Sequence, residues 1–213
     1  MFIIGVVGEK QSGKDTLCKI LHERMPYHRV VRLAFADPLK AELAAACGVS
    51  VDEINEQKKR FRLGLQWWGT EFRREEDRNY WINRLLDDLI RVRDSVDARS
   101  EKLIVVITDV RFENEAELIR NFNGMLVRLV RGSWMRRLLR KLTRPLRFNH
   151  ASEELATRSN RYFDYVIHNP GDDLASFAGR INEFILASEL VRRANAPTYL
   201  EYYRFCQSSR TDS

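Results

Sequence analysis

The sequence contains little cysteine and no long apolar segment. Its three cysteines are odd in number, widely spaced and outside any Cys-x-x-Cys pattern, which argues against a disulfide framework or a zinc site and favours a reducing compartment. The longest apolar runs, such as 103–107, are far shorter than the roughly 20 residues that a membrane-spanning helix requires. The first residues lack a basic region followed by a cleavage site, so we expect a cytoplasmic protein with no membrane partner.

Acidic residues are missing from one segment of an otherwise mixed chain. The 213 residues include 36 Lys or Arg and 30 Asp or Glu, which gives a formal net charge of +6. Between Arg131 and Arg147 there are seven basic residues and no acidic one. This excess of positive charge points to anionic partners: phosphates, nucleotides or nucleic acids. A solvated surface is the structural alternative for such a run.

Apolar runs alternate with helical patterns along the chain. Continuous apolar runs predict buried strands at 2–7, 30–35, 103–108, 126–130 and 165–167. The alternation predicts an α/β protein in which a five-stranded parallel sheet lies between two layers of helices. No repeat or linker divides the sequence, so we expect one domain at 1–193 followed by a tail at 194–213.

Several helix ends can be placed from capping residues. Asp37-Pro38 predicts the start of a helix, and Gly48 predicts its end. The spacing of Ser50–Glu53 is that of a capping box. Residues 66–97 are expected to be mostly helical, and a final amphipathic helix is expected at 173–193.

A phosphate-binding motif follows the first predicted strand. Residues 8–16 have the G-x-x-x-x-G-K spacing between a strand and a helix, which is the context that this motif requires. The two glycines let the loop curl so that its N–H groups converge on a phosphate, while Lys14 reaches the β- and γ-phosphates. We therefore expect ATP to be bound by Gly8, Lys10, Gln11, Ser12, Gly13, Lys14, Asp15 and Thr16.

The residue after Lys14 departs from the usual motif. A Ser or Thr hydroxyl that helps to hold Mg²⁺ usually stands there, whereas this chain has Asp15 followed by Thr16. Asp15 can bind magnesium directly or through water, or Thr16 can serve the α-phosphate, and both alternatives stay open. Asp109 ends an apolar strand in the manner of a Walker B acid and is a third candidate ligand.

Polar residues follow the predicted strands at their carboxyl ends, where ligands gather in an open α/β sheet. Two of them have a structural alternative: Asp37 could be no more than a helix cap, and Arg111 could pair with Glu115 on the helix surface. The set consists of Asp37, Lys40, Asp109, Arg111 and Arg131.

Residues 66–74 combine aromatic side chains, a glycine and two arginines. Stacking on a base and binding of a monophosphate would need such a mixture. Burial in the core is the alternative, and we expect it for at least one of Trp67 and Trp68.

The basic segment at about 131–152 is interpreted as a lid. Arginines that close over reacting phosphates neutralise their charge. Leucines make the segment amphipathic, so binding to nucleic acid or to a membrane surface is the alternative. His150-Ala151-Ser152-Glu153 ends the segment, and a serine cap on the next helix is the structural alternative there.

In combination, these motifs resemble the deoxynucleoside monophosphate kinases of tailed bacteriophages, a branch of the P-loop NMP-kinase fold. The resemblance implies transfer of the γ-phosphoryl group of ATP to a dNMP with Mg²⁺, in the host cell cytoplasm if the protein is phage-encoded. The matching blocks occur in order: Gly13–Thr16, Phe35–Lys40, Gln66–Glu71 with Arg73, Asp109–Glu115, His150–Glu153 and Asp164–Asn169.

The resemblance also implies roles for individual residues. Catalysis would involve Lys14, Asp109, Arg111 and Arg131. The metal would be held by Asp15, Thr16 and Asp109, and Arg136 and Arg137 of the lid would contact ATP. Acceptor binding, within a helical region at about 37–98 and at the lid, would use Asp37, Lys40, Gln66, Trp68, Arg73, Arg111, His150 and Glu153. The tail lies outside the match, and its aromatic residues are candidates for contacts in a homodimer.

Two other functions remain as alternatives. One is a P-loop kinase of another phosphorylated small molecule, such as dephospho-coenzyme A or phosphomevalonate, because the Gly-Lys-Asp sequence occurs in the latter kinases too. The aromatic block at 66–72 favours a nucleobase instead. The other is a DNA-stimulated ATPase, which would need further motifs for which the chain has little room, so we expect no nucleic-acid partner.

Overall fold

A computed structural model describes residues 1–96, 102–132, 155, 157–171, 173–188 and 190. The chain divides into two compact units. The first, called the sheet unit here, consists of Met1–Arg32 and Val96–Ser213, and the second, the helical unit, consists of Leu33–Ser95. Most of the predicted lid and the whole tail at 194–213 lie outside the described residues.

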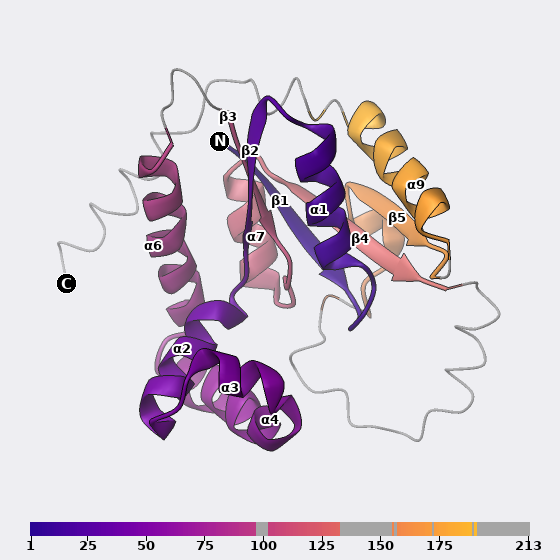
Figure 1. The fold of residues 1–213 in the computed structure, drawn as a ribbon. Coiled ribbons are helices and arrows are strands. Elements are labelled where there is room, and N and C mark those ends of the chain that lie inside the picture. The colour runs from indigo at the N-terminus through magenta and orange to yellow at the C-terminus, as the bar shows by residue number, and fades with distance from the viewer. Residues whose placement is uncertain (97–101, 133–154, 156, 172, 189, 191–213) are drawn as a thin grey trace. The chain divides into compact units, whose positions relative to one another are not determined.

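The sheet unit is built on the five-stranded parallel sheet that the sequence predicts (Figure 1). The strand order is β2-β3-β1-β4-β5. Strand β1 pairs in parallel with both β3 and β4, and β4 pairs in parallel with β5. The strands are β1 (Phe2–Gly8), β2 (His28–Leu33), β3 (Lys102–Ile107), β4 (Met125–Arg131) and β5 (Tyr165–Asn169).

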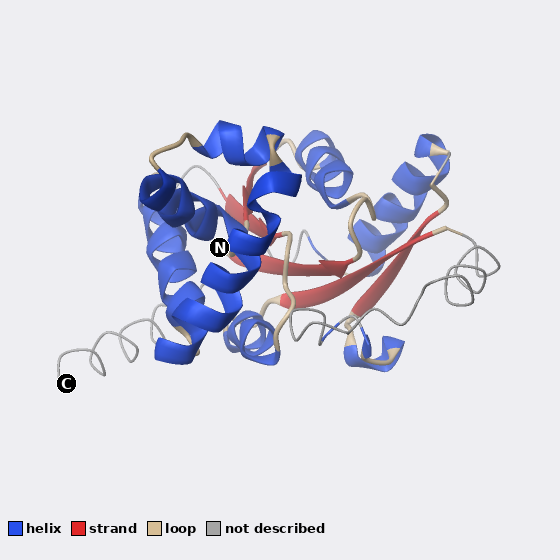
Figure 2. Ribbon diagram, turned by 90° about the horizontal axis from the view of Figure 1, so that it is seen from below, coloured by secondary structure: helices blue, strands red, loops and turns tan. Residues whose placement is uncertain are grey.

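Helices cover both faces of this sheet (Figure 2). On one face, Phe2, Ile4 and Val6 of β1 form a core with apolar residues of α1 (Lys14–Arg24) and α9 (Leu174–Ala187). On the other face, Gly5 lies against Ile119 of α7 (Glu113–Asn121), where a Cβ would clash. The expected three-layer arrangement is therefore present. A short 3₁₀ helix, η3 (Asn160–Tyr162), precedes β5.

The helical unit is a run of short helices. It contains α2 (Ala36–Cys47), α3 (Val51–Glu56), α4 (Lys58–Gln66), the π-helix η1 (Trp67–Phe72), α5 (Arg73–Glu76) and α6 (Tyr80–Asp94). A small core of Leu43, Ala44, Ile54 and Phe61 lies among α2, α3 and α4. Trp81, Leu85 and Leu89 form a buried stripe on α6.

Several predicted helix ends are confirmed. The Ser50 hydroxyl accepts a hydrogen bond from the N–H of Glu53 at the start of α3, and Asp173 likewise caps α9 through Ser176. Gly48 ends α2 in the left-handed conformation, with φ at 66°. Helix α9 ends at Ala187, short of the predicted residue 193.

Two boundaries differ from the predictions, and one helix was missed. Strand β2 begins two residues earlier and ends two residues earlier than predicted, because α2 already begins at Ala36. Asp37 is therefore in the first turn of α2 rather than at its N-cap, a position where an acid still suits the helix dipole. Helix α4 was not predicted, because among its residues only Phe61 is buried.

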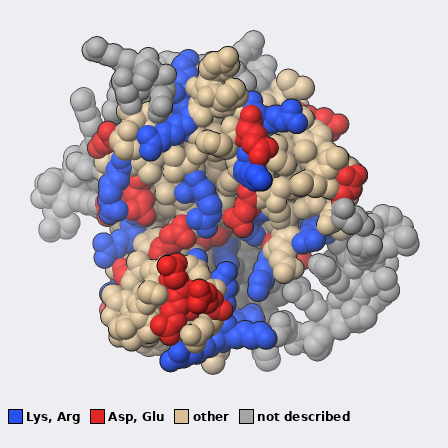
Figure 3. Space-filling model, viewed as in Figure 1, with Lys and Arg blue, Asp and Glu red and all other residues tan. Residues whose placement is uncertain are grey.

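Figure 3 shows Lys and Arg side chains intermixed with Asp and Glu on the visible face of each unit. In the part of the chain that the structure describes, no helix has the length and apolar character needed to cross a membrane.

Candidate active site

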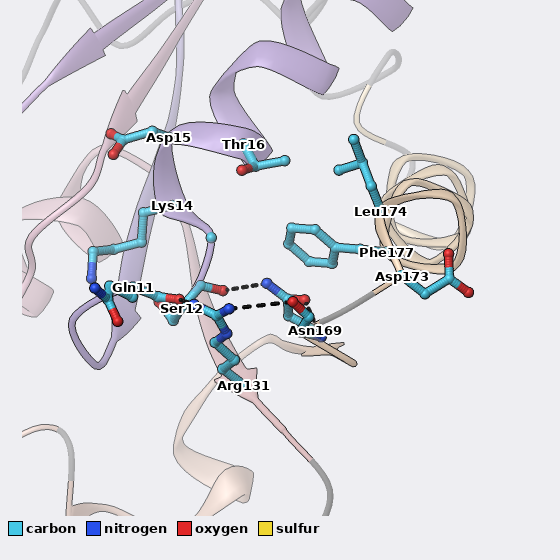
Figure 4. A pocket seen from close by; sticks show the side chains of 12 residues that line it. Gln11, Ser12, Lys14, Asp15, Thr16, Arg131, Asn169, Asp173, Leu174 and Phe177 are labelled. Carbon is cyan, nitrogen blue, oxygen red and sulfur yellow. Dashed lines mark hydrogen bonds between the residues drawn. The ribbon is translucent and has the colours of Figure 1, made fainter.

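The phosphate-binding loop joins β1 to α1 in the sheet unit (Figure 4). Gly13 has φ at 100°, a backbone conformation that residues other than glycine rarely adopt. A Cβ on Gly13 would lie 2.6 Å from Nδ2 of Asn169 and 2.9 Å from a ring carbon of Phe177. A Cβ on Gly8 would lie 2.6 Å from the Ser12 hydroxyl oxygen. A side chain at Gly13 would thus meet both an unfavourable φ and close neighbours, whereas one at Gly8 would meet the Ser12 hydroxyl.

The ends of β4 and β5 hold this loop through a ring of hydrogen bonds. Nη1 of Arg131 donates to the carbonyl oxygen of Gln11 at 2.7 Å, and Nδ2 of Asn169 donates to that of Ser12 at 2.9 Å. Nη2 of Arg131 donates to the carbonyl oxygen of Gly171 at 3.2 Å, and the Gly171 N–H donates to Oδ1 of Asn169 at 2.9 Å. The ring fixes two successive carbonyl groups of the loop.

This ring has a consequence for the phosphate-binding N–H groups. In a trans peptide the C=O and N–H bonds point in opposite directions. Holding the Ser12 carbonyl against Asn169 therefore turns the N–H of Gly13 the other way. The ring also holds Gln11, whose φ of 63° is unfavourable for a residue with a side chain.

Lys14 folds over its own loop. Its Nζ donates to the carbonyl oxygens of Gly8 and Glu9, both at 2.8 Å. The ammonium group is thereby held next to the space where the loop would bind phosphate.

The charged residues predicted for catalysis lie within electrostatic reach of Lys14. Burial lowers the pKa of the Lys14 ammonium, and the positive charge of Arg111 lowers it further. The negative charges of Asp109 and Asp15 oppose this shift. The charges of Asp109 and Arg111, which follow β3, therefore act on Lys14 of the phosphate-binding loop.

The loop that carries Asp109 and Arg111 is held by a buried carboxylate. Glu115 is 1% exposed and accepts hydrogen bonds from the backbone N–H groups of Arg111, at 2.7 Å, and Phe112, at 3.2 Å. The Arg111 carbonyl oxygen accepts one from the N–H of Leu155 at 3.1 Å. In these bonds Glu115 contacts the backbone of Arg111, whereas the sequence suggested a side-chain pair.

A pocket of about 390 Å³ opens beside the phosphate-binding loop (Figure 4). It is lined by residues 11–16 of the loop and by Arg131, Asn169, Gly171, Asp173, Leu174 and Phe177. The sequence analysis did not assign Asn169 or the start of α9 to the site. Their position just after a predicted strand is the same signal that had identified Asp109, and it could have found them.

The acceptor-side candidates with a described position all belong to the helical unit, apart from Arg111. Nζ of Lys40 lies 3.7 Å from a carboxylate oxygen of Asp37, and Gln66 is the last residue of α4. Trp68 packs against the small core of this unit, as expected for one of the two tryptophans, while Trp67 is 50% exposed. The remaining predicted positions lie outside the described residues: Arg136, Arg137, His150 and Glu153.

Comparison with known proteins identifies the family. The family model of phosphomevalonate kinase matches residues 6–124, more than half of the chain. The chain belongs to this family. It is a P-loop kinase of small molecules, and membership implies the use of ATP.

Other proteins that are similar to this kinase are named for other acceptors. A protein of Acanthamoeba polyphaga mimivirus named "Putative deoxynucleotide monophosphate kinase" is 30% identical over 153 residues, which cover 62% of the kinase and 75% of that protein. Among solved structures, shikimate kinase from Aquifex aeolicus matches with a TM-score of 0.43 and 15% identity, covering 89% of this chain and 99% of its own. Shikimate kinase from Acinetobacter baumannii matches with a TM-score of 0.41 and 17% identity, covering 89% and 96%.

Two of the residues that the resemblance implies as metal ligands, Asp15 and Thr16, lie in the first turn of α1. Asp15 has a side chain that is 90% exposed, and its carboxylate lies 3.6 Å from Nε of Arg32. In Figure 4 the side chains of Asp15 and Thr16 point to opposite sides of α1, with Thr16 toward Leu174. The described residues contain no cluster of three or more potential metal ligands. A site of one or two carboxylates completed by nucleotide phosphates and water is the usual arrangement for Mg²⁺.

Proposed function

We propose that this kinase transfers the γ-phosphoryl group of ATP to a deoxynucleoside monophosphate, giving ADP and a dNDP. The observation that carries this choice of acceptor is a cluster of rings and a guanidinium group in the helical unit. Trp67 stacks on Phe72 with a centroid distance of 5.2 Å and an interplanar angle of 9°, and Arg73 lies 4.9 Å from the Phe72 ring centre. Flat rings suit a base, and a guanidinium group suits a phosphate. The name of the mimivirus relative supports the same acceptor.

The donor is assigned to the pocket beside the phosphate-binding loop. The loop N–H groups and Lys14 would bind the phosphates, as the G-x-x-x-x-G-K motif requires. The apolar side chains of Leu174 and Phe177 line the same pocket and offer a surface for the adenine ring. Thr16 also lines this pocket and would contact the α-phosphate.

The reaction would proceed by positioning and charge neutralisation, with no covalent intermediate. Lys14 would exchange its bonds to Gly8 and Glu9 for bonds to the donor phosphates, and Arg111 would add positive charge beside it. Asp15 and Asp109 would hold Mg²⁺, which neutralises phosphate charge when bound. The acceptor oxygen is already anionic near neutral pH, so no strong general base is needed.

The remaining assignments of the sequence analysis stay proposals of the same kind. They are contacts of Asp37, Lys40, Gln66, His150 and Glu153 with the acceptor, contacts of Arg136 and Arg137 with ATP, and a catalytic role of Arg131. A homodimer through the tail belongs with them.

A second acceptor is favoured by a specific finding. The matching family model is that of phosphomevalonate kinase, so phosphomevalonate must be tested as an alternative acceptor. Both candidates are phosphate monoesters, and they differ in that only the nucleotide carries a base.

The test is ADP release from Mg·ATP with each dNMP, each NMP, phosphomevalonate and dephospho-coenzyme A offered in turn. Turnover with one or more dNMPs is expected, and Lys14→Met should abolish it. Turnover with phosphomevalonate or dephospho-coenzyme A, and with no dNMP, would overturn the proposal that the acceptor is a dNMP. ATP hydrolysis that needs no acceptor and rises with added DNA would overturn the kinase reaction itself.

A further inference from the structure

Glu42 of α2 accepts hydrogen bonds from three side chains of the helical unit and forms an ion pair with a fourth. Its Oε2 accepts from Nε1 of Trp68 and from Nε of Arg73, both at 3.2 Å. Its Oε1 accepts from the Tyr80 hydroxyl and lies 3.3 Å from Nη2 of Arg84. One carboxylate thus connects α2 with η1, α5 and α6, and no pattern in the sequence singles it out.

The carboxylate of Glu42 is held in its charged form. Its side chain is 18% exposed. Burial alone would raise the pKa of Glu42, but hydrogen bonds from Tyr80 and Trp68 and the charges of Arg73 and Arg84 outweigh burial and lower it. At neutral pH the cluster therefore contains one anion between two cations.

The guanidinium group of Arg73 is held by Glu42 on one edge and lies against two aromatic rings. It lies 4.9 Å from the ring centre of Phe72 and 4.8 Å from that of Tyr80. Its Nε is bound by Glu42, while Nη1 lies 3.3 Å from Glu76, whose side chain is 57% exposed. Among the described residues, the structure gives Nη2 of Arg73 no hydrogen-bond partner.

These contacts leave one side of Arg73 available to an anion. The exposed pair with Glu76 is of the weak kind that solvent competes with readily, so Nη1 can exchange it for a phosphate oxygen. Nη1 and Nη2 together form the bidentate edge that matches a phosphate. The bond to Glu42 uses the remaining edge and sets the direction in which that pair of groups points.

We propose that Glu42 is a positioning residue for the acceptor. It holds Arg73 so that Nη1 and Nη2 receive the acceptor phosphate. As a statement about the acceptor this inference rests on the proposed function. The bond from Glu42 to Arg73 serves any phosphate monoester, whether or not it carries a base.

The variant that tests this is Glu42→Gln, which keeps the size of the side chain and removes its charge. Glu53→Gln is the matched control, because Glu53 of α3 pairs with Arg60 at 3.4 Å in the same unit and outside the cluster. Glu42→Asp keeps the charge on a shorter side chain. If the charge matters, Glu42→Asp should recover part of what Glu42→Gln loses.

Steady-state kinetics give the expected result. Glu42→Gln should raise the KM for the acceptor about tenfold or more, the effect of losing a charged hydrogen bond, with less than about threefold change in kcat or in the KM for ATP. Glu53→Gln should leave all three unchanged. An unchanged acceptor KM in a folded Glu42→Gln protein would overturn the inference, and so would equal effects of the two variants.

A double-mutant cycle separates positioning from a general effect on folding. In an Arg73→Ala background, Glu42→Gln should raise the acceptor KM no further, because Arg73 is the group through which Glu42 acts. Additive effects would overturn the inference. Should Glu42→Gln fail to fold, the cycle is run with Glu42→Asp, and the same two outcomes decide.

The proposed function and the proposed role of Glu42 are overturned by different results. If phosphomevalonate or another monophosphate is phosphorylated in place of every dNMP, the proposed function is wrong, and the cycle with that acceptor still decides the role of Glu42. If no monophosphate of the panel is phosphorylated or bound at equilibrium, both are overturned.

Discussion

Arg131 donates to the carbonyl oxygen of Gln11 at 2.7 Å across 120 positions of sequence. The bond ties the end of β4 to a loop residue in the left-handed region of φ. The sequence analysis placed Arg131 among the catalytic residues. In the structure, both of its terminal nitrogens contact backbone carbonyl oxygens of the sheet unit, at Gln11 and at Gly171. Arg131 therefore supports the shape of the phosphate-binding loop.

Replacing Asn169 tests whether these hydrogen bonds to the phosphate-binding loop contribute to ATP binding. Asn169→Ala removes the bond to the Ser12 carbonyl oxygen and the acceptor for the Gly171 N–H. We expect the KM for ATP to rise about three- to tenfold per lost bond, with a smaller change in kcat. Asn83→Ala, on α6, is the control and should leave the KM for ATP unchanged. An Asn169→Ala enzyme with unaltered ATP kinetics would show that the ring has no role in binding.

Lys14→Met should separate activity from stability. Loss of the ammonium group should lower turnover by about 100-fold or more, since it removes charge stabilisation at the transferred phosphoryl group. The pKa of Lys14 is lowered in the folded protein, so at neutral pH the charged ammonium favours the unfolded state relative to a lysine with an unshifted pKa. Without nucleotide, Lys14→Met should therefore raise the Tm in a thermal scan.

The control for Lys14 is Lys19→Met on the same helix. Lys19 has a side chain that is 77% exposed, and it lies 3.9 Å from Glu23. Its replacement should change neither turnover nor Tm by much. A fall in Tm for Lys14→Met alone would mean that the two bonds to the loop carbonyl groups outweigh the cost of burying the charge.

Gly13→Ala and Gly179→Ala should have opposite effects on stability. At Gly13 the positive φ and the close approach of Asn169 leave no room for a methyl group, so we expect a loss of about 1–3 kcal/mol and of ATP binding. Gly179 lies in α9 with nothing within 4 Å of an added Cβ. There, alanine should stabilise the protein by about 0.5–1 kcal/mol. Urea unfolding of both variants checks the difference in sign.

The cysteines Cys18 and Cys47 should differ in reactivity. Burial, together with the charge of Asp15, raises the pKa of Cys18 to about 11, whereas Cys47 is exposed at the end of α2. The thiolate is the reactive form, so at pH 8 iodoacetamide should label Cys47 and spare Cys18. Peptide mass spectrometry in a Cys206→Ser background reads out both positions. Rapid labelling of Cys18 in the native protein would contradict its burial.

Glu42 should make the free energy of unfolding depend on pH in the acidic range. Its pKa is lowered on folding, so the stabilisation that it contributes is fully present above the ordinary glutamate pKa and is lost as the pH falls through the folded value. The free energy of unfolding of the wild type should therefore decrease below about pH 4.3. Glu42→Gln should show a shallower decrease, and identical pH profiles would mean that folding does not lower the pKa of Glu42.

The sequence predicted those parts of the molecule that depend on local pattern. Buried strands such as β1 and β3 are continuous apolar runs, and Ser50 and Asp173 bond to residues three positions away. The phosphate-binding loop is local in the same sense. The π-helix η1 could not be predicted, because six residues are too few to distinguish its period from that of an α-helix.

The parts that the sequence did not reveal depend on distant contacts. Arg131 and Asn169 are register partners in the pairing of β4 with β5, a fact that only the sheet supplies. Glu42 reads as one charge on an ordinary helix, since its partners lie 26 positions away or more: Trp68, Arg73, Tyr80 and Arg84.

The helical unit Leu33–Ser95 is a single continuous insertion with an apolar core of its own. The ring of hydrogen bonds that holds the phosphate-binding loop is formed by residues of the sheet unit: Arg131, Asn169 and Gly171. Mutations in the helical unit can therefore accumulate without breaking the hydrogen bonds that hold the phosphate-binding loop. During evolution, the specificity for the phosphoryl donor can therefore stay the same while the specificity for the acceptor changes.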